Sequence, residues 1–341
     1  MIVVIVDHYI RQTPGGAMYR TEPLKVHLFF TQQTATDAFD RALSAGTTRE
    51  LVDFEDLLSS LFSGPPPMGS DILARCGHDA DAQRVIAEFL SARGRFDEAP
   101  ALAAVVTTVD ATTLACLLFG GSVDDIPDGV TSAMATASQI EHASTVVLTG
   151  WNEMEQSDLF LLVAALGHLN PSATFVLLGP GGSLGTRASC LDIAEASLNR
   201  PGWLHVLSGT FTPRLPHPRL NAFRYENCRP FHPGRLAELL SFGLGDELPG
   251  RLIRSAGFCQ LASRPRTAFL WDQCGTEFGF AAPAIEAYSS EPVAFGQDLA
   301  IFGLDLDVAQ TVAALDECVL DDTEFLLGPD GWKTLPDPFP R

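Results

Sequence analysis

Uninterrupted runs of apolar and β-branched residues alternate with helical patterns through the first two thirds of this chain, and this alternation constrains its fold most. The predicted strands cover residues 2–6, 102–109, 144–149 and 173–178. The predicted helices cover residues 34–45, 80–93, 132–142, 158–169 and 186–198. Strands that are apolar on both faces occur in parallel sheets that helices cover on both sides. The pattern therefore predicts an α/β domain with a doubly wound, mostly parallel sheet.

The stretch TPRLPHPR, residues 212–219, holds three prolines and is the best candidate for a domain boundary. Beyond it the predicted strands cover residues 219–227, 251–262, 266–272 and 299–304, and the predicted helices cover 232–243 and 307–320. Strands that are followed by covering helices favour a small α+β domain. We therefore expect an α/β domain over 1–211, a linker over 212–218 and an α+β domain over 219–341.

The formal net charge of −20 over 341 residues limits the classes of partner. Such an acidic chain repels phosphate backbones and anionic membranes, which argues against nucleic-acid and membrane roles and suits a basic partner or a cation. The first residues lack the pattern of a signal peptide, and the longest apolar run, 159–166, is too short to span a bilayer. The seven cysteines show no C-x-x-C spacing, which argues against a disulfide framework. We expect a cytoplasmic protein.

Several blocks of the chain carry a family resemblance. In order, RPFHPGRL (229–236), LIRSAGF (252–258), the segment 299–325 and GPDGWKTLPDPFP (328–340) resemble the C-terminal domain of the CobW-like metallochaperone GTPases. The segments ALAAVVTTVDA (101–111) and SQIEHASTVVLTGWNEM (138–154) resemble two consecutive strands of the GTPase domain of that family. The resemblance implies a GTPase-like α/β domain followed by a CobW C-terminal domain, and a role in metal homeostasis or metalloprotein maturation.

The chain departs from the family at the phosphate-binding P-loop, G-x-x-x-x-G-K-[ST]. That loop needs glycines whose N–H groups face the phosphates and a lysine that reaches them. The only lysines are Lys25 and Lys333, and neither follows a glycine. The opening IVVIVDHY resembles the second strand of the family, so we expect the phosphate-binding strand, loop and first helix to be absent. A truncated gene model that lacks an upstream P-loop is an open alternative.

Two further motifs of the family are altered. Thr149, Gly150, Trp151 and Asn152 stand at the positions of the guanine-reading Asn-Lys-x-Asp. Asn152 offers an amide where a carboxylate accepts two N–H bonds from guanine, so guanine selectivity should be lost. The segment 28–39, where the family's Gly-Cys-x-Cys-Cys should fall, contains no cysteine. We therefore expect neither GTP binding nor the family's metal site.

Five residues are the candidate site. Asp110, Trp151 and Asn152 mark the edge of a vestigial nucleotide site, where parallel strands end. Cys76 and His78, in ARCGHDAD (74–81), could bind a transition metal such as Zn²⁺ with help from elsewhere. The competing interpretations are structural, since Asp79 could cap the next helix and Trp151 could pack locally.

Two other sequence features have a structural and a functional interpretation. His232 precedes Pro233 at a predicted helix start, so it could be a functional histidine or could cap or pack the helix. The glycine-rich turn at 177–186 follows a strand and could bind an anion, but an ordinary β–α loop is favoured.

Three hypotheses about function follow. The preferred one is a pseudo-GTPase of the CobW-like type, a non-hydrolysing binding or adaptor module. Its partner would be a client protein, a CobW-like GTPase that pairs with an exposed sheet edge, or a second copy of the chain. The second is an enzyme with a repurposed site in the α/β crevice, and the third is a truncated CobW-like GTPase. GTP hydrolysis is not expected under the first.

Overall fold

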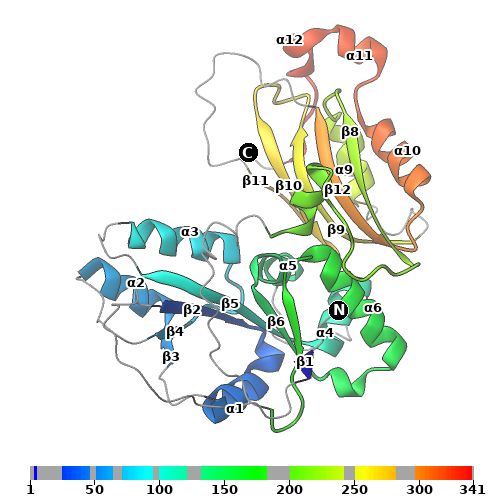
Figure 1. The fold of residues 1–341 in the computed structure, drawn as a ribbon. Helices are drawn as coiled ribbons and strands as arrows, with labels where there is room; N and C mark the ends of the chain where they lie inside the picture. The colour runs from blue at the N-terminus through cyan, green and yellow to red at the C-terminus, as the bar shows by residue number, and fades with distance from the viewer. Residues whose placement is uncertain are drawn as a thin grey trace. The chain divides into compact units, whose positions relative to one another are not determined.

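The structure, a computed structural model, describes most of the chain. The described residues are 4–5, 25–46, 51–63, 71–94, 100–120, 132–182, 200–241, 250–281 and 296–339. The chain divides into two compact units, Met1–Pro201 and Gly202–Arg341. Each unit has its own sheet, as Figure 1 shows.

The sheet of the first unit is parallel throughout its described pairs. Its strands are β1 (Val4–Ile5), β2 (Lys25–Thr31), β3 (Leu51–Asp53), β4 (Ile72–Arg75), β5 (Ala101–Asp110), β6 (Thr145–Thr149) and β7 (Thr174–Leu177). They lie in the order β1-β7-β6-β5-β2-β4-β3. The main helices are α1 (Thr36–Gly46), α2 (Phe54–Ser63), α3 (Ala82–Arg93), α4 (Ala111–Phe119), α5 (Ala133–His142) and α6 (Gln156–Leu169).

Successive side chains of β2 face opposite sides of this sheet, and helices cover both. Leu28 and Phe30 are fully buried in a cluster with side chains of α2 and α3. Phe29, between them, packs against Phe39 of α1 with ring centroids 5.4 Å apart. The predicted α/β sheet with helices on both faces is confirmed.

Several elements of this unit were not predicted. The central strand β2, the short strands β3 and β4, and the helices α2 and α4 were all missed. Of the predicted opening strand, residues 2–6, the structure describes Val4–Ile5, which lie at the edge of the described sheet and pair with β7. His27 and Thr31 interrupt the apolar pattern of β2, although both are buried. The predicted helix 186–198 lies outside the described residues.

The second unit contains an antiparallel sheet in the order β11-β10-β9-β12-β8. Its strands are β8 (Leu220–Asn227), β9 (Arg251–Gln260), β10 (Ala268–Cys274), β11 (Glu277–Ala281) and β12 (Gln297–Leu304). Its helices are α8 (Gly202–Leu207), α9 (Pro233–Ser241), α10 (Val308–Cys318), α11 (Asp322–Leu326) and α12 (Gly328–Trp332). The predicted α+β architecture is confirmed, and β11 is an additional strand.

Helices cover both faces of the antiparallel sheet. Leu236 of α9 and Leu315 of α10 share a core with Trp271. On the other face, Val206 of α8 packs with Ala300 and Phe302 of β12. Because α8 belongs to this core, the second unit begins before the proline-rich stretch that was predicted as the linker. Within the described residues, no helix is both long enough and apolar enough to cross a membrane.

Candidate functional site

The order in which strands are added to the sheet of the first unit reverses beside β2. The chain goes from β2 through α1 to β3 and β4 on one side, whereas β5, β6 and β7 lie on the other. Ligands of open α/β folds bind at such a switch point, beyond the carboxyl ends of the strands. The segment from β2 to α1 lies at this switch point. It holds Thr31-Gln32-Gln33-Thr34-Ala35-Thr36, without glycine or lysine.

Gln32 connects the two central strands at this switch point. Its backbone N–H donates to the carbonyl of Thr108 at 2.9 Å, and its side-chain Oε1 accepts the N–H of Asp110 at 3.0 Å. The side chain is 1% exposed, and its Nε2 has no hydrogen-bond partner among the described residues. A buried glutamine side chain thus links the carboxyl ends of β2 and β5 at the switch point.

Asp110 caps the helix that follows its strand. Its Oδ1 accepts the backbone N–H groups of Thr112 at 3.1 Å and Thr113 at 3.0 Å, and both threonine hydroxyls donate to the same oxygen. These bonds satisfy N–H groups that α4 leaves without an intrahelical partner. Asp110 therefore has a structural role that accounts for its position at the strand end.

The loop after β6 is shaped by Gly150. Its φ of +64° lies in the left-handed region, and a Cβ at this position would overlap with Oδ2 of Asp110 and lie 3.2 Å from its Cγ. Trp151 is half-buried, and its Nε1 has no hydrogen-bond partner within the described part of the chain. Asn152 is exposed. The structure thus brings Asp110 and Gly150 into contact and leaves the Asn152 side chain in solvent.

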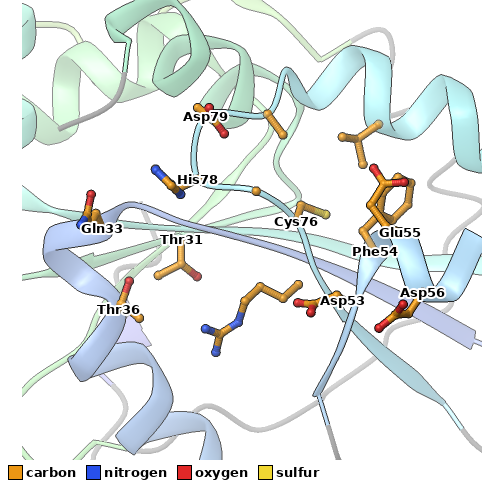
Figure 2. Close-up of a pocket in the computed structure, with 14 residues that line it drawn as sticks. Thr31, Gln33, Thr36, Asp53, Phe54, Glu55, Asp56, Cys76, His78 and Asp79 are labelled. Atoms are coloured by element: carbon orange, nitrogen blue, oxygen red, sulfur yellow. The ribbon is translucent and has the colours of Figure 1, made fainter. Parts of the chain in front are cut away.

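Cys76 and His78 line a pocket at the ends of β2 and β4, with a cavity volume of about 680 Å³ (Figure 2). We call it the β2–β4 pocket. Its other lining residues are Thr31, Gln33, Thr36, Asp53, Phe54, Glu55, Asp56, Arg75, Gly77, Asp79, Ala80 and Val85. Gln139 of α5 holds the loop that carries His78, since its Nε2 donates to the carbonyls of His78 and Ala80, both at 2.9 Å.

Cys76 and His78 have no third metal ligand beside them among the described residues. Burial raises the pKa of the Cys76 thiol, which disfavours the thiolate that a metal binds. No group of three or more His, Cys, Asp or Glu side chains that could hold a metal gathers anywhere in the described residues. The structure also corrects one assignment here. Asp81, not Asp79, caps α3, because its side chain accepts the N–H of Gln83 at 3.0 Å.

Several polar residues of this region were missed by sequence reasoning. Thr31 and Thr108 face each other in the pairing of β2 with β5, and both are buried. The hydroxyl oxygen of each is buried without a hydrogen-bond partner among the described residues. The signal in the sequence was a run of polar residues directly after an apolar strand, in Thr31, Gln32 and Gln33. A buried polar group without a partner is uncommon and is often completed by a water or a ligand.

In the second unit, His232 caps α9. Its Nδ1 accepts the N–H of Arg235 at 3.3 Å, and Pro233 takes the first helical position. Arg235 in turn binds both oxygens of Glu324 at 2.9 and 2.7 Å. These hydrogen bonds lower the pKa of Glu324 to about 2. The structure thus places His232 in a capping position.

The glycine-rich turn after β7 is only partly described. Gly182 donates its N–H to the carbonyl of Gly179 at 3.0 Å, which closes a tight turn. Residues 183–199, where a helix N-terminus was expected, lie outside the described residues.

Parts of this chain match a protein-family model and a curated protein. Residues 220–319 match the model of the cobalamin synthesis protein cobW C-terminal domain. The zinc-regulated GTPase metalloprotein activator 1 of Dictyostelium discoideum is 26% identical over 226 residues. That match covers 59% of this chain and 46% of the relative, so the chain spans about half the length of the curated protein that it matches.

Two solved structures are also similar. The Zn(II)-bound YjiA GTPase of E. coli aligns at a TM-score of 0.37 and 13% identity. A Zn(II)-bound triple mutant of YjiA aligns at a TM-score of 0.39 and 12% identity. Each alignment covers 88% of this chain and 100% of the other.

Proposed function

We propose a function from the premise that this chain is a CobW-like protein whose residues 220–319 form a cobW C-terminal domain. It acts as a pseudo-GTPase, that is, as a binding or adaptor module that does not hydrolyse GTP. Its role belongs to metal homeostasis or metalloprotein maturation, in which it binds a protein partner.

The segment between β2 and α1 is the observation that carries this proposal. A P-loop lines the phosphates with backbone N–H groups and adds the charge of a lysine. Here Oε1 of Gln32 accepts the N–H of Asp110, and the lysine of this strand, Lys25, stands at the opposite end of β2 from Gln32. Residues 31–36 contain no lysine, so this segment does not supply the positive charge that reaches the outer phosphates of a nucleotide.

The loop after β6 supports the same proposal. Asn152 replaces the carboxylate that would accept two N–H bonds from guanine. A side chain at position 150 is disfavoured, because φ is +64° and a Cβ there would overlap with Oδ2 of Asp110 unless that side chain moved. Both changes weaken the recognition of guanine, so the phosphate end and the base end of the site are altered together.

The proposed partner of this chain is a client protein. The similar Dictyostelium protein is described as an activator of metalloproteins, a role that implies a client protein. The net charge of −20 favours a basic surface on that client. A competent CobW-like GTPase or a second copy of this chain are the other candidate partners.

The test is a titration of the full chain with fluorescently labelled GTP and Mg²⁺. A CobW-like GTPase that carries the Gly-Lys-Ser/Thr sequence serves as the positive control. We expect no saturable binding at micromolar GTP by this chain and clear saturation by the control. Micromolar binding that unlabelled GTP competes away would refute the proposal.

A further inference from the structure

We propose that the β2–β4 pocket binds a cationic organic group, a guanidinium or a primary ammonium. The inference deepens the proposed function and rests on its premise that a nucleotide does not fill this edge of the sheet. It assigns the pocket a ligand of the opposite charge to a phosphate.

Four carboxylates dominate the charge of the pocket. Asp53 ends β3, Glu55 and Asp56 lie in the first turn of α2, and Asp79 lies in the loop before α3; all four are exposed. Within the described residues, none of these carboxylates forms a side-chain hydrogen bond or a salt bridge, although Glu55 interacts electrostatically with Arg84 of α3. Figure 2 shows the first three together on one side of Thr31. Like charges in one cleft attract a counter-ion and repel an anionic phosphate.

The one arginine of the lining does not offset these charges. The guanidinium of Arg75 pairs with Asp40 of α1 and lies 6.0 Å from the ring centroid of Phe39. Its positive charge is therefore balanced on the α1 side of the pocket. A ligand meets the remaining carboxylates with little competition from this group.

The hydroxyl group of Thr31 is a second feature of the pocket that favours a cation, independent of the carboxylates. Its side chain lines the pocket and the residue is 6% exposed, yet its hydroxyl oxygen has no hydrogen-bond partner among the described residues. Carboxylates only accept hydrogen bonds, and a hydroxyl oxygen has lone pairs to accept them. Guanidinium and ammonium groups only donate. A donor-rich cation thus matches both the charge and the vacant acceptors.

The size of the pocket favours an organic cation over a bare metal ion. Its volume of about 680 Å³ lies in the range of pockets that hold small organic ligands. Phe54 and Val85 add apolar surface for the hydrocarbon stem of such a ligand. No metal-binding group of three side chains gathers in the described residues. The ligand chemistry is that of an arginine or lysine side chain, or of a free amine of similar size.

The experiment is a calorimetric titration of the full chain with agmatine, which carries one guanidinium and one primary ammonium. Matched titrations use an arginine-containing peptide and inorganic phosphate. The variants are Asp53→Asn and Thr31→Val, and Glu155→Gln is the control, because it removes an exposed carboxylate outside the lining.

We expect agmatine to bind and phosphate not to bind. Asp53→Asn should weaken agmatine binding about threefold to tenfold at low ionic strength, and added salt should weaken it further. Thr31→Val should weaken it without lowering the thermal midpoint, and Glu155→Gln should leave it unchanged. Tighter binding of the peptide than of agmatine assigns the pocket to a protein side chain, and the reverse assigns it to a free amine.

Two results would overturn the inference. One is the absence of agmatine and peptide binding, and the other is binding that Asp53→Asn and Thr31→Val both leave unchanged. These failures are distinguishable from a failure of the proposed function, which would appear as saturable binding of GTP. If neither GTP nor agmatine binds, the inference fails and the proposed function stands.

Discussion

Asp110 and Gly150 lie in direct contact at the carboxyl ends of two neighbouring strands. Oδ1 of Asp110 is occupied by the donors of α4, and Oδ2 lies where a Cβ of residue 150 would stand. The glycine is also in the left-handed region, with a φ of +64°. The contact and the backbone conformation together favour glycine at position 150.

Gly150→Ala should destabilise the first unit for two reasons. The left-handed backbone is strained by roughly 1 kcal/mol for a non-glycine residue, and the overlap with Asp110 adds about 1–3 kcal/mol. Gly181→Ala is the matched control, because its φ is +80° but a Cβ would meet no atom within 4 Å. Denaturant unfolding of both variants separates the two terms. Equal losses of stability would show that the Asp110 contact contributes nothing.

Asp110→Ala should lower stability through the loss of a helix cap. The change removes the acceptor of two backbone N–H groups of α4 and should cost about 1–2 kcal/mol in the free energy of unfolding. Asp110→Asn is the conservative comparison, since an asparagine also caps helices and should cost less. Thermal unfolding of the two variants measures the difference. A larger loss for Asn than for Ala would contradict the capping role.

Thr31→Val should keep or raise the free energy of unfolding. A buried hydroxyl without a partner is unfavourable by about 1–3 kcal/mol, and valine has nearly the same shape. Thr107→Val is the control, because the Thr107 hydroxyl donates to the carbonyl of Gln139 at 2.8 Å. We expect the control to lose stability in chemical denaturation. A comparable loss in Thr31→Val would mean that the Thr31 hydroxyl is hydrogen-bonded in solution.

The Arg235–Glu324 pair should make the second unit sensitive to acid. The hydrogen bonds from Arg235 lower the pKa of Glu324 from 4.5 to about 2 in the folded chain. A lowered pKa means that the stabilisation is present above the unfolded-state pKa of about 4.5 and is lost as the pH falls towards 2. Because the pair is partly exposed, we expect it to contribute about 1–2 kcal/mol at neutral pH.

Arg235→Lys tests this expectation, because it keeps the charge and loses the two-pronged contact. The stability of the variant should depend less on pH between about 4.5 and 2 than that of the unaltered chain. Arg84→Lys is the control, since Arg84 pairs with Glu88 on an exposed helix face. Stability measured by denaturant across this pH range gives the comparison. Parallel pH profiles for the Arg235 variant and the unaltered chain would be the contrary result.

The sequence predicted the elements whose residues are apolar or periodic over a long span. The strands β5, β6 and β7 and the helices α3, α5 and α6 lie within a few residues of their predicted bounds. The central strand β2 was missed because His27 and Thr31 break its apolar pattern, and they are buried only in the folded sheet. Strands as short as β3 carry too few residues for any pattern.

The candidate site was predictable only in part, because its chemistry depends on contacts between distant segments. Sequence spacing pointed to Asp110 and to the loop after β6, and the structure brings Asp110 and Gly150 together. It could not show that Gln32 would bond to Asp110, since these residues are 78 positions apart. The grouping of Asp53 and Thr31 in one pocket also arises from tertiary packing alone.

GTP turnover is the measurement that tests the central claim most directly. The full chain would be incubated with millimolar GTP and Mg²⁺, and released phosphate would be followed beside a CobW-like GTPase that retains its P-loop lysine. Because Gln32 occupies the switch point and no lysine follows a glycine, the account predicts phosphate release at the rate of the protein-free control. Release that exceeds this background, scales with protein concentration and saturates with GTP would contradict it.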